Sequence, residues 1–97
     1  MSTIRIHRHH AEGSTAVRRK AENIARRIAA RHAVSWRWQG DSLELEAPTG
    51  LASGTRGRVT IGEGDVAIEI ELPLLLRPMR RMVEREVSAK LDAALAT

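Results

Sequence analysis

The chain has 97 residues, of which 42% are hydrophobic and 29% charged, with a formal net charge of +4. This length favours a single domain over residues 1–97, and the composition is that of a globular rather than a disordered protein. The absence of cysteine excludes a disulfide scaffold, a thiolate metal site and a cysteine nucleophile. The sequence shows no transmembrane segment and no apolar stretch of a signal peptide at its start, so we expect a cytoplasmic protein.

The first half of the chain predicts a strand, a helix and a hairpin. Residues 3–8 alternate polar and apolar side chains, as a half-buried strand does. Gly13-Ser14-Thr15 then supplies a break and a hydroxyl that can cap a helix. From about 15 to 32, the spacing of the apolar residues predicts a helix with an arginine-rich outer face. Residues 34–38 and 43–47 alternate again, and Gly40-Asp41 between them is typical of a hairpin turn.

The second half predicts two more strands and a second helix. Residues 48–54 are rich in turn formers and predict a loop, followed by strands over 55–61 and 66–72 with a turn at 62–65 between them. Arg77-Pro78 marks the start of a last helix, because proline suits the first helical turn. The element order is β-α-β-β-β-β-α, an α+β fold. We expect one mainly antiparallel sheet with both helices packed on one face.

Outward-facing charges on the strands test the pairing register. Closing the two predicted hairpins places three arginines opposite three glutamates: Arg37–Glu44, Arg58–Glu69 and Arg56–Glu71. Such pairs disfavour slipped pairings, so the acidic middle of the chain has a structural explanation. The first β-α-β unit could form a right-handed crossover, and the first strand could lie beside either the second or the fifth.

We find no constellation of residues that predicts catalysis, so no catalytic residue and no cofactor is assigned. His7 and His9 point the same way on an extended segment close to His10, and two imidazoles could share a metal ion. The further ligands of a closed metal site are missing, which favours ordinary polar histidines at the end of a strand. The paired glutamates are expected to stay ionised beside their arginines, so general-acid catalysis is disfavoured and the protein is interpreted as a non-enzyme.

Two surfaces are candidate contact sites. The outer face of the first helix could bind an anionic surface through five cations, unless it is simply a solvated face; they are Arg18, Arg19, Lys20, Arg26 and Arg27. Specific nucleic-acid binding is disfavoured, because no helix-turn-helix or aromatic strand accompanies these cations. Leu74, Leu75 and Leu76 cannot all share one strand face, so we expect them to turn the corner into the last helix and to be partly buried. The alternative is that one or two of them are exposed and form, with Met79, an adhesive patch.

Trp36 and Trp38 are the only aromatic residues of the chain, and they share the inward side of one strand. We expect them to provide the bulk of the core. The alternative is an apolar cleft beside them, between sheet and helices, that would make the protein a small lipid-binding module.

The whole pattern resembles the small polyhydroxyalkanoic acid system proteins. The matching segments are the opening strand with Arg8 and His10, the Ala/Arg-rich first helix, and three further stretches: residues 38–43 (WQGDSL), the Gly54/Gly57-Arg58-Val59 strand, and residues 72–78 (LPLLLRP). The chain departs from the family at Ala33 and Leu45, where aromatics are usual, and at Pro73, where glycine is frequent.

The resemblance implies a non-enzymatic protein at polyester inclusions, in contact with the polyhydroxyalkanoate granule surface or with granule proteins. It implies neither a catalytic residue nor an oligomeric state. An electrostatic binder of nucleic acid or anionic surfaces is the alternative from another class.

Overall fold

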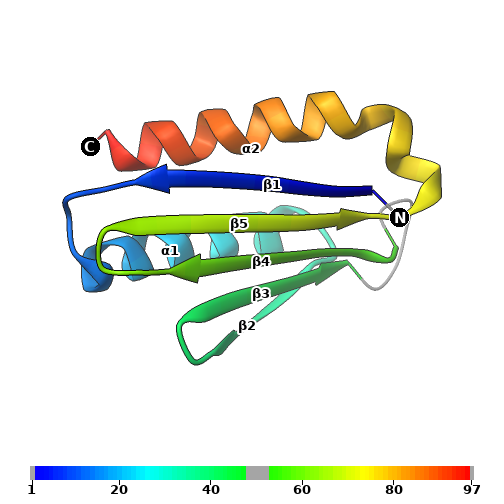
Figure 1. Ribbon diagram of the computed structural model, residues 1–97. Coiled ribbons are helices and arrows are strands. Elements are labelled where there is room, and N and C mark those ends of the chain that lie inside the picture. The colour runs from blue at the N-terminus through cyan, green and yellow to red at the C-terminus, as the bar shows by residue number, and fades with distance from the viewer. Residues whose placement is uncertain (1, 48–52, 97) are drawn as a thin grey trace.

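The computed structural model describes residues 2–47 and 53–96. In this part of the chain, five strands form one antiparallel sheet in the spatial order β1-β5-β4-β3-β2 (Figure 1). The elements are β1 (Ser2–His9), α1 (Ser14–Arg31), β2 (Ser35–Gln39), β3 (Ser42–Ala47), β4 (Thr55–Ile61), β5 (Asp65–Leu72), the 3-10 helix η1 (Leu74–Met79) and α2 (Arg80–Leu95). The predicted α+β class and element order are confirmed, whereas most of the predicted loop 48–54 lies outside the described residues.

The strand register follows the charge pattern of the sequence. All three predicted pairs are present, and each arginine of β4 also faces a glutamate of β3. Gly40 begins the tight turn between β2 and β3 with a φ of 61°, which a glycine adopts without strain. The sheet therefore has one face of alternating charges, and its other face carries the apolar side chains.

The strand β1 lies at the edge of the sheet beside β5, which settles the alternative that the sequence left open. Ile4 faces Ile70, Ile6 faces Ile68, and on the outer face Arg5 stands opposite Glu69. Both strands therefore contribute isoleucines to the same inner face. β2 forms the opposite edge, and α1 connects the two edges across the sheet (Figure 1).

The two helices cover different halves of the inner face. α2 runs along β1, and α1 lies against β2, β3 and β4 (Figure 1). The core is aliphatic: it is built from the inner side chains of β1 and β5, with Val17 of α1 and Leu91 of α2 packed on them. The expectation that the tryptophans supply the bulk of the core is wrong, because β2 is an edge strand. Trp36 and Trp38 are half-buried against α1, and only Trp38 packs on the core cluster.

Two helix starts differ from the sequence prediction. Gly13, with a φ of 84°, occupies the N-cap of α1, and no side-chain hydroxyl caps the helix. α2 begins at Arg80 rather than at Pro78, because the chain leaves β5 through the 3-10 helix η1, which contains Pro78. The amide of Leu76 donates to the carbonyl of Pro73 at 2.9 Å, so the turn is already closed before the proline.

Candidate functional site

The corner between β5 and α2 exposes large apolar side chains. Leu74 and Leu75 are 73% and 70% exposed, and Met79 and Met82 are 41% and 48% exposed. We call these four residues the apolar corner. Leu76 packs partly buried against the core, so the expectation of a partly buried turn is confirmed for Leu76 and wrong for Leu74 and Leu75. Met82 was missed as a surface residue, because its spacing places it on the apolar stripe of the last helix.

The apolar corner is held in place by two hydrogen bonds to backbone carbonyl groups. Pro73 keeps an extended backbone at the end of β5, and Leu76 bonds back to it. At the start of α2, the Arg80 guanidinium donates to the carbonyl oxygen of Thr3 on β1 at 3.0 Å. The exposed leucines therefore lie on a turn that is tied to the sheet on both sides.

Three of the five cations proposed on the outer face of α1 are engaged within the fold. The Arg18 guanidinium lies 4.1 Å from the centroid of the Trp38 ring and 3.3 Å from the Asp41 carboxylate. Lys20 forms an ion pair with Glu12 and donates to the carbonyl of Ala94 in α2 at 2.7 Å. These contacts hold Arg18 and Lys20 within the fold, so fewer cations of α1 are available to bind an anionic surface.

Arg26, the third of these cations, belongs to a cluster around Glu22. Arg26 lies over Trp36 at 5.5 Å and donates to Glu22 at 3.1 Å, and Trp38 Nε1 donates to the same carboxylate at 2.8 Å. The hydrogen bond from Trp38, followed by that from Arg26, holds the pKa of Glu22 below its ordinary value of 4.5. Arg19 and Arg27, the remaining two candidates, are exposed and have no ion pair with any described residue.

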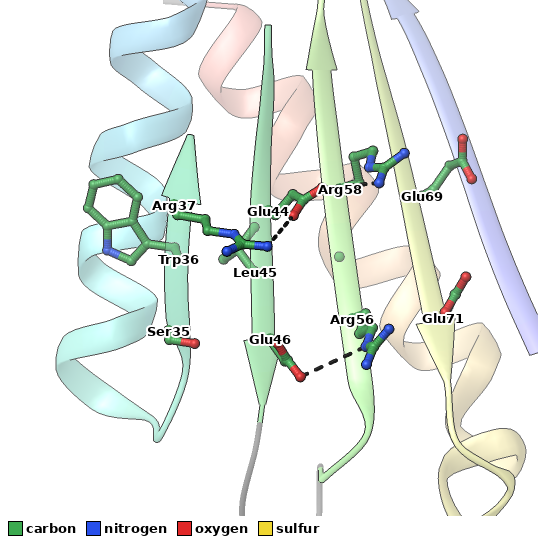
Figure 2. Close-up of a pocket in the computed structure, with 11 residues that line it drawn as sticks. Ser35, Trp36, Arg37, Glu44, Leu45, Glu46, Arg56, Arg58, Glu69 and Glu71 are labelled. Carbon is green, nitrogen blue, oxygen red and sulfur yellow. Dashed lines mark hydrogen bonds and ion pairs between the residues drawn. The ribbon is translucent and has the colours of Figure 1, made fainter. Parts of the chain in front are cut away.

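The outer face of the sheet has a shallow hollow of about 480 Å³ that is lined by charged side chains (Figure 2). Glu44 in its centre accepts from Arg37 at 3.5 Å and from Arg58 at 3.0 Å, and Arg56 lies 3.9 Å from Glu46. Cations and anions alternate from strand to strand, so the charges of the three arginines and four glutamates that line the hollow nearly cancel. This face has the chemistry of a solvated salt-bridge network, and it favours neither an anion site nor a general acid.

Two histidines in or directly after β1 also have local partners. His7 Nε2 lies 2.8 Å from Asp65 Oδ2, and His10 Nε2 lies 3.1 Å from the carbonyl oxygen of Gly62. The hydrogen bond with His7 lowers the pKa of Asp65 from its ordinary 3.8. Over residues 2–47 and 53–96, no group of three or more potential ligands could hold a metal ion.

A narrow apolar groove of about 280 Å³ separates α1 from α2 over the inner face of the sheet. Ile24 and Ile28 line it from α1, and Val87 and Leu91 from α2. The cleft that the sequence suggested beside Trp36 and Trp38 therefore exists elsewhere, because neither tryptophan lines this groove. The indoles lie at the sheet edge under α1, and the groove follows the gap between the helices.

Neither helix in the described ranges has both the length and the apolar character needed to cross a bilayer. Comparison with protein families gives one description, "putative polyhydroxyalkanoic acid system protein", whose model matches residues 4–95. No curated protein and no solved structure gives a significant match. The matched range includes most of β1, both helices and the apolar corner.

Proposed function

Because the chain belongs to the polyhydroxyalkanoic acid system protein family, we propose that it is a non-enzymatic cytoplasmic protein of polyhydroxyalkanoate storage that associates with granules through its apolar corner. The observation that carries this proposal is the exposure of Leu74 and Leu75, at 73% and 70%, on a turn fixed to the sheet. Side chains of this size are rarely left in water as a group unless a partner surface covers them.

The exposed area of the apolar corner is sufficient for adsorption. Full burial of a leucine or methionine side chain stabilises by about 1.5–3 kcal/mol. Scaled by the exposed fractions of the four side chains, covering the corner contributes about 3–7 kcal/mol. Part of this gain is offset by the loss of translational and rotational freedom, so we expect reversible rather than permanent attachment.

A non-catalytic role is supported by the partners of three carboxylates, two on the sheet and one on α1. Glu44 and Glu46 are paired with arginines, and the pKa of Glu22 is lowered rather than raised. A general acid needs a raised pKa to hold its proton at neutral pH. Glu44 and Glu46 therefore serve as partners of arginines, and the lowered pKa of Glu22 does not suit a general acid.

Co-sedimentation with polyester granules tests the proposal. The Leu75→Glu variant should lose most of the bound fraction, because it places a charge in the centre of the apolar corner. Ala30→Glu is the matched control, since it makes the same change of charge at an exposed position on α1. Equal binding of the two variants, or no binding of the unmodified protein, would remove adsorption through the corner.

A second comparison in the same assay distinguishes direct attachment to the polymer from attachment through a granule protein. Protein-free polyester particles offer only the polymer surface, whereas granules isolated from cells also carry their proteins. If the corner contacts the polymer, both preparations bind the protein and Leu75→Glu weakens both interactions. Binding to the native granules alone, with the same sensitivity to Leu75→Glu, assigns the contact to a granule protein.

A further inference from the structure

The groove between α1 and α2 is hollow because its floor lacks a side chain. Gly57 lies on β4 between Leu45 of β3 and Ile70 of β5, and both of these neighbours line the groove. A Cβ atom added to Gly57 would meet Leu45 at 3.9 Å, an ordinary van der Waals distance on the same side of the sheet. The floor therefore has room for apolar atoms that the protein itself does not supply.

The mouth of the groove is cationic. A second hollow of about 510 Å³ opens between the same two helices, and it shares five lining residues with the groove: Lys20, Ile24, Ile28, Lys90 and Ala94. Arg27 and Arg31 of α1 line this mouth together with Lys90, and no carboxylate lines it. None of these three cations has an ion pair with a described residue.

A polar contact joins the two helices where the groove meets its mouth, because both partners line the two hollows. Lys20 of α1 donates to the carbonyl of Ala94 in α2 and is neutralised by Glu12. This bridge ties α1 to α2 at the boundary between the groove and its mouth. The groove is therefore part of the folded architecture and needs no rearrangement to exist.

We propose that the groove binds a single-chain aliphatic carboxylate, with the chain over Gly57 and the carboxylate among Arg27, Arg31 and Lys90. An apolar slot with a small number of convergent polar groups is the usual form of a small-molecule site. The volume of about 280 Å³ is close to the lower end of such sites, so it suits one short acyl chain rather than a two-chain lipid. Three cations at a mouth whose lining contains no carboxylate select an anionic head group.

Octanoate, used well below its micelle concentration, is the probe, and its titration is followed by the backbone amide shifts of the protein. We expect saturable shifts around Gly57 and the facing turns of both helices. Octan-1-ol has the same chain without the charge and should bind at least about fivefold more weakly. Arg31→Gln and Lys90→Gln should each weaken octanoate binding up to about fivefold, because exposed ion pairs contribute modestly.

Two control variants and one filling variant separate this site from other surfaces. Arg19→Gln removes an exposed cation of α1 that does not line the mouth, and Leu75→Glu disrupts the apolar corner; both should leave octanoate binding unchanged. Gly57→Val fills the floor and should abolish binding while the protein stays folded, since valine suits a strand.

The proposal is overturned if octanoate produces no saturable shifts, or if octanol binds as tightly. Octanoate binding that survives Gly57→Val in a folded variant, or that is lost in Leu75→Glu, would place the ligand elsewhere and would equally overturn it. Because the granule assay depends on Leu75 and this one does not, failure of either proposal can be recognised separately.

Discussion

Leu75 and Leu76 are neighbours in the chain but occupy opposite environments, so identical substitutions should have different effects. Leu76 packs partly buried against the core, and Leu76→Ala should lower the free energy of unfolding by about 1–3 kcal/mol, the low end for a buried leucine. Leu75 is 70% exposed, and Leu75→Ala should change stability by no more than about 0.5 kcal/mol. Granule adsorption should be weakened more by Leu75→Ala than by Leu76→Ala, since covering the Leu75 side chain contributes about 1–2 kcal/mol.

Urea unfolding followed by tryptophan fluorescence measures the difference, because Trp36 and Trp38 are the only aromatic residues of the protein. With the dependence on urea usual for small domains, a loss of about 2 kcal/mol moves the midpoint by about 1–2 M. Unchanged slopes of the transition would show that stability alone has changed. Equal midpoint shifts for the two alanine variants, or a larger shift for Leu75→Ala, would refute the assignment of the two leucines to opposite sides of the turn.

Further predictions concern the charged groups. The pKa of Glu22 is lowered by the hydrogen bond from Trp38, and the pKa of Asp65 by the hydrogen bond from His7. Both carboxylates therefore stabilise the fold at pH values above their unfolded pKa values of 4.5 and 3.8. This contribution to stability is lost as the pH falls through the lowered pKa values of the folded protein. The free energy of unfolding of Glu22→Gln should therefore depend less steeply on pH in acid than that of the unmodified protein. Trp38→Phe should raise the pKa of Glu22, which carboxyl NMR titration measures; an unchanged pKa would contradict the contact. Glu44→Lys should lower the free energy of unfolding by about 1 kcal/mol or more, and Glu44→Gln by about 0.5 kcal/mol, with both losses smaller in high salt. Losses that do not depend on salt in urea unfolding would argue against the salt-bridge network on the outer face of the sheet.

Much of the sheet could be predicted because the charge pattern and the alternation of apolar residues agree. The register of Arg58 with Glu69 fixes the same alignment that buries Ile68 and Ile70, so a slip by one residue would violate both. The helix starts were less predictable, because Gly13 and the turn at Pro78 depend on how the chain enters and leaves the sheet. Local propensity carries no information on that geometry.

The tryptophans show where sequence periodicity stops being informative. Alternation correctly placed Trp36 and Trp38 on the side of the strand that faces α1, but it does not tell which strand forms an edge. Since β2 lies at the edge, both indoles are only half-buried, and two arginines of α1 lie over their rings. The same arginines looked available for an anionic partner as long as the strand order was unknown.

The position of the aromatics also explains why a groove exists at all. The chain has no phenylalanine and no tyrosine, and its two indoles are placed at the sheet edge. The gap between α1 and α2 is therefore lined by aliphatic side chains over a floor with Gly57, and these do not fill it. An open apolar groove forgoes packing energy that a larger side chain at this position could supply. A small domain has little stability to lose, so the hollow is better explained by an occupant than by chance.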